Sequence, residues 1–228
     1  MDSFPEQREM SKDDYVIILG DFGIWRDSPQ QRWYLNWLEE KRFTTLFIDG
    51  NHENYDVLDS YPVEEWHGGK VHFIKPSVIH LMRGQVFDID GLKFFTFGGA
   101  ASHDISDGVL EIDDPRVKEW RDDPDKMYRI NHISWWEREM PNQEEMDEGI
   151  KNLAEHNNKV DFILTHCTAS STAALLSHGL YKPDKLTNYL EEVRCNIDYK
   201  HWLCGHYHDN KAITTKDIVL YEQIVRVA

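Results

Sequence analysis

The stretch TTLFIDGNHE, residues 44–53, indicates the class of fold. Its first half, Thr44–Ile48, is an unbroken apolar run, which is typical of a strand buried on both faces. Upstream, Tyr15–Leu19 is a second run of this kind, and it ends next to Asp21. Between the two runs, Pro29 can open a helix whose apolar residues recur at helical spacing. This order of strand, helix and strand predicts a parallel sheet with right-handed crossovers.

The pattern of strands and helices continues to the end of the chain. Short apolar runs split by Gly or Pro predict an antiparallel meander with strands at 71–74, 78–82, 85–89 and 92–97. Further strands are expected at 160–164, 201–204, 212–214, 218–221 and 224–227, and further helices at 142–156, 169–177 and 183–193. The sequence has no repeat or clear linker. Residues 1–228 are therefore expected to form one domain, with an irregular excursion at about 100–141.

The composition argues against several classes of protein. Asp and Glu total 41 against 25 for Lys and Arg, which gives a net charge of -16. So acidic a surface disfavours nonspecific binding to nucleic acid or to an anionic membrane. No apolar stretch of about 18 residues predicts a transmembrane helix, and the polar amino terminus is unlike a secretory signal. Three cysteines without a CxxC spacing favour reduced thiols and a cytoplasmic location.

Four of the apolar runs end in groups that can bind a metal ion. The groups are Asp21, Asn51 with His52, His166, and His206 with His208. In α/β sheets, ligands bind beyond the carboxyl ends of the strands, so these side chains are expected to converge. Carboxylate, amide oxygen and imidazole together suit borderline divalent ions such as manganese, iron(II) or zinc. Each residue alone is equally consistent with a turn or a buried polar contact, so the signal is their joint occurrence.

Four short motifs occur in order along the chain: GDFG at 20–23, GNHE at 50–53, TH at 165–166 and GHYH at 205–208. Together they resemble the ordered motifs of the calcineurin-like metallophosphoesterases, and the resemblance runs from about Tyr15 to the end. It implies an α/β fold in which two packed mixed β-sheets are flanked by helices, a four-layer α/β/β/α sandwich, here without its first strand. It also implies hydrolysis of a phosphomonoester or phosphodiester, with a small phosphorylated substrate and no membrane partner.

The resemblance also assigns roles to single residues. Metal-binding roles fall on Asp21, Asn51, His166, His206 and His208. Asp21 would bridge two ions. Asn51, His166 and His206 would complete the shell of one ion, and His208 would belong to the shell of the other. His52 would be the general acid that protonates the leaving oxygen after attack by a metal-bound hydroxide. Two ions about 4 Å apart can clamp phosphate oxygens in this way. Manganese is the expected metal, with iron(II) or zinc as alternatives.

The resemblance breaks at the amino terminus. Members of this family normally open with D-x-H, but the first histidine in this chain is His52. Only 14 residues precede Tyr15, too few for a further strand and crossover. Three explanations compete: an amino-terminal truncation, a variant that binds one ion, or a catalytically impaired member that acts as a protein-binding scaffold. Truncation is favoured because the other motifs are intact, and weak hydrolysis with tight binding of one ion is then expected.

Some residues outside the motifs have open interpretations. The excursion would form either a lid over the substrate or a packed surface feature, and it carries His103, Asp104, Arg129, His132, Trp135 and Trp136. Candidate arginine contacts to phosphate are Arg116, Arg121 and Arg129. Glu53 is expected to support the site without binding metal. Core positions are expected for Trp33, Trp37, Cys167 and Cys204.

Overall fold

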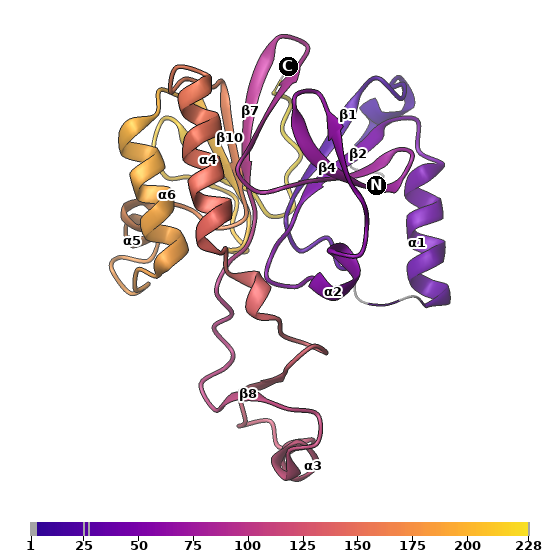
Figure 1. Ribbon diagram of the computed structural model, residues 1–228, viewed down its shortest axis with the longest axis vertical. Coiled ribbons are helices and arrows are strands. Elements are labelled where there is room, and N and C mark those ends of the chain that lie inside the picture. The colour runs from indigo at the N-terminus through magenta and orange to yellow at the C-terminus, as the bar shows by residue number, and fades with distance from the viewer. Residues whose placement is uncertain (1–3, 25, 27, 228) are drawn as a thin grey trace.

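A computed structural model describes residues 4–24, 26 and 28–227 (Figure 1). Within these residues, five strands form one mixed sheet in the order β1-β2-β5-β4-β3, and six form another in the order β12-β13-β11-β10-β7-β6. The strands of the first sheet are β1 (Tyr15–Leu19), β2 (Thr44–Ile48), β3 (Val63–Trp66), β4 (Gly69–Lys75) and β5 (Val78–Leu81). Those of the second are β6 (Gln85–Ile89), β7 (Leu92–Phe97), β10 (Phe162–Thr165), β11 (His201–Cys204), β12 (Lys211–Ala212) and β13 (Asp217–Val219).

Parallel pairing dominates the centre of both sheets. In the first sheet, β2 lies between β1 and β5 and is parallel to both. In the second, β10 lies between β7 and β11 and is again parallel to both. Antiparallel partners, β4 and β6, join at β5 and β7 respectively. The carboxyl ends of the central strands in each sheet therefore meet at one edge of that sheet.

The two sheets pack face to face through side chains that alternate along each strand. In β2, Leu46 and Ile48 enter the core between the sheets, whereas Phe47 points to the other face. In β10 of the second sheet, Phe162 and Leu164 also enter the core between the two sheets. This alternation follows from the two-residue period of a strand, and strands buried on both faces must be apolar throughout.

Helices cover the outer face of each sheet. The helices are η1 (Pro5–Arg8), α1 (Pro29–Glu39), α2 (Tyr55–Leu58), α3 (Pro115–Trp120), η2 (Glu137–Glu139), α4 (Gln143–Glu155), α5 (Ser170–Leu176) and α6 (Lys185–Asn196). Leu35 and Leu38 of α1 pack on the first sheet, while α4 and α6 pack on the second. Capping boxes at the first turns of α4 and α6 satisfy backbone donors there. The result is the predicted four-layer α/β/β/α sandwich of two mixed sheets.

Several local predictions were wrong. The meander expected over 71–97 is divided, because β4 and β5 belong to the first sheet and β6 and β7 to the second. Residues 224–227, expected as a closing strand, have no strand partner in the described structure. Trp33 is 66% exposed, although it was expected in the core, and Trp37 is only partly buried. Helical spacing places Trp33 near the edge of the apolar stripe of α1, where it stacks on Trp37 instead of packing on the sheet.

The excursion forms a projecting arm, seen at the bottom of Figure 1. It contains α3 and a small parallel pair, β8 (Gly108–Leu110) with β9 (Tyr128–Ile130). Its returning end is fixed to α2, because Trp136 is 2% exposed and its indole Nε1 donates to Asp56 over 2.7 Å. None of the described helices is long and apolar enough to cross a membrane.

Candidate metal centre

The residues singled out in the four motifs lie at the carboxyl ends of four strands. Asp21 follows β1 and Asn51 follows β2 in the first sheet, whereas His166 follows β10 and His206 follows β11 in the second. A direct hydrogen bond links the two sheets here, because Nδ1 of His166 lies 2.7 Å from the carbonyl oxygen of Leu19. The packed sheets thus bring their strand ends to one place.

The buried imidazole of His166 is the centre of this cluster. Its Nε2 atom lies 3.2 Å from Oδ1 of Asp21 and 3.2 Å from Oδ1 of Asn51. The carbonyl of Leu19 can only accept, so Nδ1 of His166 carries the proton and Nε2 of the neutral ring is unprotonated. A ring lone pair therefore faces two oxygen atoms that also carry lone pairs.

Such an arrangement is favourable only if a positive charge lies among the three atoms. Either a second proton on His166 or a metal ion can supply that charge. Metal–ligand bonds of about 2.1 Å place neighbouring ligand atoms of one ion roughly 3.0–3.4 Å apart, which matches the observed spacing. The donor set of carboxylate, amide oxygen and imidazole fits a borderline divalent ion. The donor atoms present therefore fit a divalent metal ion.

His206 stands beside this group of three ligand atoms. Its ring centroid is 5.0 Å from that of His166, at an interplanar angle of 65°. In the part of the chain that the structure describes, no three His, Cys, Asp or Glu side chains already enclose a metal position. The convergence at His166 instead includes the amide of Asn51, and His206 would have to approach the ion with its own ring.

The backbone at the centre is held in conformations that side chains other than glycine rarely adopt. Asp21 has a φ of 52° and His206 a φ of 65°, both in the left-handed region. Gly50 approaches so closely that a Cβ atom there would overlap the carboxylate of Asp21. Strained backbone and close packing of this kind are common at functional sites, where the surrounding fold imposes the geometry.

Electrostatics keep the candidate ligands in the protonation states that metals bind. Burial alone would raise the pKa of Asp21, but positive charge at His166, which either a second proton or a metal ion could supply, and at His52 holds it well below its usual range. Burial lowers the pKa of His206 to about 3, and the neighbouring His166 and His103 add to this effect. A carboxylate and a neutral imidazole are the forms that coordinate a metal ion.

His52 lies at the rim of the cluster. Its backbone N–H donates to Oδ1 of Asp21 over 3.1 Å, and its ring is partly buried. Burial lowers the pKa of the imidazole, and the nearby Arg129 lowers it further, whereas Asp21 and Asp104 oppose the shift. Asp104 and Arg129 form an ion pair at the base of the arm, with Nε of Arg129 3.0 Å from Oδ1 of Asp104. The base of the arm thus contributes charges to the surroundings of His52.

Two residues that the sequence analysis missed orient Asn51. Its Nδ2 donates to Oγ of Ser102 over 3.3 Å, and Ser102 in turn donates from Oγ to Oε2 of Glu139 over 2.7 Å. The backbone N–H of Ser102 also donates to Glu139, whose pKa is raised by burial. With its amide nitrogen committed to Ser102, Asn51 must present its oxygen to His166. Ser102 follows β7, which is parallel to β10. Had this pairing been known, the expectation that ligands bind beyond the carboxyl ends of parallel strands would have pointed to Ser102.

Glu53, the last residue of GNHE, supports the site as expected. Its buried carboxylate accepts from the backbone N–H groups of Phe22, Gly23 and Ile24 at 2.7, 3.0 and 3.2 Å. Burial raises the pKa of this carboxyl to about 8, and the backbone donors at Ile24 and Phe22 oppose the shift. The side chain of Glu53 thereby fixes the loop that carries Asp21.

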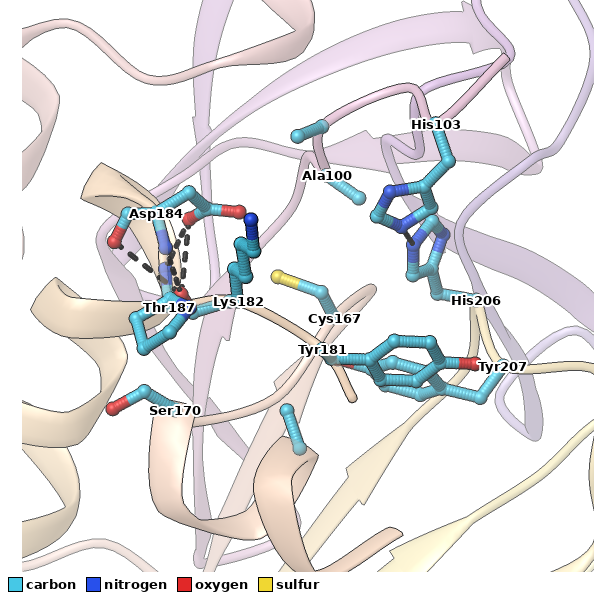
Figure 2. A pocket seen from close by; sticks show the side chains of 13 residues that line it. Ala100, His103, Cys167, Ser170, Tyr181, Lys182, Asp184, Thr187, His206 and Tyr207 are labelled. Carbon is cyan, nitrogen blue, oxygen red and sulfur yellow. Dashed lines mark hydrogen bonds between the residues drawn. The ribbon is translucent and has the colours of Figure 1, made fainter. Parts of the chain in front are cut away.

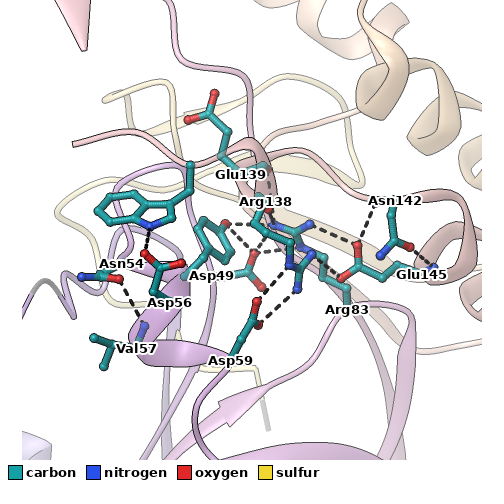
Figure 3. Close-up of polar contacts among 12 residues, drawn as sticks. Asp49, Asn54, Asp56, Val57, Asp59, Arg83, Arg138, Glu139, Asn142 and Glu145 are labelled. Atoms are coloured by element: carbon teal, nitrogen blue, oxygen red, sulfur yellow. Dashed lines mark hydrogen bonds and ion pairs between the residues drawn. The ribbon is translucent and has the colours of Figure 1, made fainter. Parts of the chain in front are cut away.

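A network of buried charges surrounds Asp49, the residue that follows β2 (Figure 3). Arg83 donates from Nε and Nη2 to Oδ2 of Asp49, at 2.8 and 2.6 Å, and Nε2 of His80 lies 3.2 Å from Oδ1 of that carboxylate. Burial alone would raise the pKa of Asp49, but Arg83 and His80 hold it below its usual range. Arg138, at the base of the arm, joins this network because its carbonyl oxygen accepts from Nη2 of Arg83 and because Glu145 pairs with both arginines. The loop from Asp49 to Glu53 is therefore anchored at both ends.

Other candidate residues lie apart from the cluster. The ring of His208 is exposed and stacks on Tyr221, with centroids 4.8 Å apart, so its assignment to a second metal ion stays a prediction. Arg116 pairs with Asp114 on the exposed helix α3 of the arm. Cys167 and Cys204 are buried thiols whose pKa values are raised by burial.

A small pocket with a cavity volume of about 20 Å³, which is room for about one water molecule, opens beside His206 (Figure 2). His103, Tyr181 and Tyr207 form a row of rings at one side, and Cys167 lies at the back. Small side chains such as Ala100 and Ala173 leave the space open. The pocket adjoins the candidate metal ligand His206.

Two packed mixed sheets with metal-competent strand ends define an α/β sandwich of the metallohydrolase type. The sequence profile of the calcineurin-like phosphoesterase family matches residues 2–210, and the chain belongs to this family. Members of the family are in general metal-dependent hydrolases of phosphate esters that use divalent ions. No curated protein matches this chain.

Proposed function

We propose that this chain hydrolyses a small phosphomonoester or phosphodiester with a divalent metal ion, most plausibly manganese, held by Asp21, Asn51, His166 and His206. The observation that carries the proposal is that Nε2 of His166 lies 3.2 Å from Oδ1 of Asp21 and 3.2 Å from Oδ1 of Asn51. When bound, the ion would act as a Lewis acid that activates water and neutralises phosphate charge.

The side chains of the site would have separate roles in metal binding, in orienting Asn51 and in proton transfer. Asp21 and the neutral imidazoles bind the cation, while Ser102 holds Asn51 in the orientation that presents its oxygen. His52 would hold a proton at the rim of the cluster and donate it to the leaving oxygen. The position of His52 next to Asp21 supports this role, since its backbone is bonded to the carboxylate that the ion would share.

The choice of metal and location rests on the chemistry of the donors. Mixed oxygen and imidazole ligands suit manganese or iron(II), and zinc is the alternative. One ion is expected from the converging set, while a second would need His208 to leave Tyr221. The three cysteines are free thiols, which supports a reducing compartment such as the cytoplasm.

A scaffold function is the second candidate, and the projecting arm favours it. Ile112 and Ile133 on this arm are 62% and 49% exposed. In a scaffold, these exposed side chains would form part of an apolar patch that binds a protein partner. A scaffold would need the fold and the arm but not the convergence of ligand atoms at His166.

One experiment distinguishes the metal-dependent hydrolase from the scaffold. The chain is stripped with a chelator, and hydrolysis of p-nitrophenyl phosphate and bis(p-nitrophenyl) phosphate is followed with and without Mn²⁺. We expect hydrolysis that returns with Mn²⁺ and is lost in His166→Ala, while His201→Ala, exposed at the opposite end of β11, behaves as the parent. Turnover that resists the chelator, or that survives in His166→Ala, would contradict the proposed mechanism. Metal binding without turnover would favour the scaffold.

A further inference from the structure

The imidazole of His103 faces the candidate ligand His206 across the mouth of the pocket (Figure 2). The two Nε2 atoms are 3.3 Å apart, and the ring centroids are 5.4 Å apart at an angle of 41°. His103 comes from the segment after β7, whose carboxyl end lies beside that of β10. A further imidazole from the second sheet thus reaches the same edge as His166 and His206.

The position of His103 is fixed by its neighbours. The preceding residue, Ser102, is clamped by two hydrogen bonds to Glu139. The ring of His103 stacks on Tyr181 at 6.1 Å and 12°, and Tyr181 stacks on Tyr207 at 5.6 Å and 25°. Adjacent residues of one segment therefore contact two candidate ligands, since Ser102 contacts Asn51 and His103 contacts His206.

The facing ring nitrogens require either a proton or a cation between them. In the absence of metal, one ring can donate a proton to the other. If the Nε2 lone pair of His206 held a metal ion, that nitrogen could no longer share a proton, and Nε2 of His103, 3.3 Å away, could supply its lone pair to the same ion. The separation of 3.3 Å lies within the roughly 3.0–3.4 Å expected between neighbouring ligand atoms of one ion.

We propose that His103 is a ligand of the divalent ion that His166 and His206 bind. The inference rests on the proposed metal site, and it adds a ligand from β7 that the four sequence motifs do not contain. His103 would add a third imidazole to the proposed ligands His166 and His206.

Direct coupling between the metal and the ring nitrogens tests this assignment. The chain is labelled with ¹⁵N in its histidine rings, stripped of metal, and loaded with ¹¹³Cd as the probe. We expect ¹⁵N–¹¹³Cd coupling at Nε2 of His103, His166 and His206, with the His103 signal identified by its loss in His103→Gln. Coupling at His166 and His206 without coupling at His103 would overturn this inference and leave the proposed metal site intact.

Binding affinity provides a second measurement. The dissociation constants for Co²⁺ and Mn²⁺ are compared among the parent, His103→Gln and the control His201→Ala, and the visible spectrum of bound Co²⁺ is recorded. Loss of a direct ligand should weaken binding by at least about tenfold and alter the Co²⁺ spectrum, while the control stays at the parent values. An unchanged spectrum and affinity in His103→Gln would refute the inference. Absence of binding in the parent would refute the metal site itself.

Discussion

Nδ1 of His166 lies 2.7 Å from the carbonyl oxygen of Leu19, although the two residues end strands of different sheets. This bond sets the tautomer of the ring and directs its Nε2 lone pair toward Asp21 and Asn51. Outer contacts of this kind orient metal-binding histidines and increase their affinity. The packing of one sheet on the other thereby determines which nitrogen is available to bind a metal.

The first prediction concerns the close approach of Gly20 to His166. A Cβ atom at Gly20 would overlap the ring of His166, and the φ of 91° is unfavourable for any other residue. Gly20→Ala should therefore displace the ring from Leu19 and weaken Mn²⁺ binding, as measured by calorimetric titration. Gly91→Ala is the matched control, because its φ of 78° is equally strained but nothing lies near its added Cβ. Equal metal affinity in both variants would show that the ring contact does not matter.

The second prediction concerns the hydrogen bonds that orient Asn51. Removing the hydroxyl in Ser102→Ala, or the carboxylate in Glu139→Gln, frees the amide to rotate. Metal affinity should fall about 10–100-fold, the usual cost of losing an outer-shell partner. The exposed Ser106→Ala serves as control. If metal affinity stays unchanged while only stability falls, Ser102 and Glu139 serve the fold alone.

The third prediction separates His52 from the metal ligands. His52→Ala should lower the turnover of p-nitrophenyl phosphate by about 10²–10⁴-fold, the usual contribution of a general acid. Metal content per chain, measured by mass spectrometry, should stay at the parent value, because the variant keeps the backbone N–H that His52 donates to Asp21. Loss of the metal together with the activity would make His52 a ligand and contradict the division of roles.

The fourth prediction concerns the buried pair of Asp49 and Arg83. Because Arg83 and His80 hold the pKa of Asp49 below its ordinary value, this carboxylate stabilises the folded state at neutral pH. In the unfolded chain it takes up a proton near about pH 3.9, so the stabilisation is present above that pH and is lost as pH falls toward the lower folded pKa.

Asp49→Asn should therefore destabilise the fold by about 3–5 kcal/mol at neutral pH, since it leaves Arg83 buried without its partner charge. The decline of melting temperature in acid should be shallower in this variant than in the parent. Asp88→Asn is the control, because its contact with Lys93 is exposed and 3.4 Å long. Identical acid profiles for the parent and Asp49→Asn would contradict the electrostatic account.

The sequence by itself determined where several central strands lie and which polar groups follow them. Thr44–Ile48 is a strand buried along its whole length, as predicted, whereas Tyr15–Leu19, predicted to be buried in the same way, is a partly buried strand at the edge of its sheet. Asp21, Asn51, His166 and His206 could therefore be named in advance as residues at strand ends. The ordered motifs added the family, which the match over residues 2–210 confirms.

Only the tertiary structure decided how distant strands pair. Local periodicity placed β7 in a meander, but β7 pairs with β10 in parallel across 64 or more residues of intervening chain, and this pairing delivers Ser102 and His103 to the site. Strand partners are selected by side-chain packing across the sheet, which leaves no mark in a short window of sequence. For the same reason no local pattern indicated the contacts from Glu139 to Ser102 or from Leu19 to His166, because each joins groups that only the packed sheets bring together.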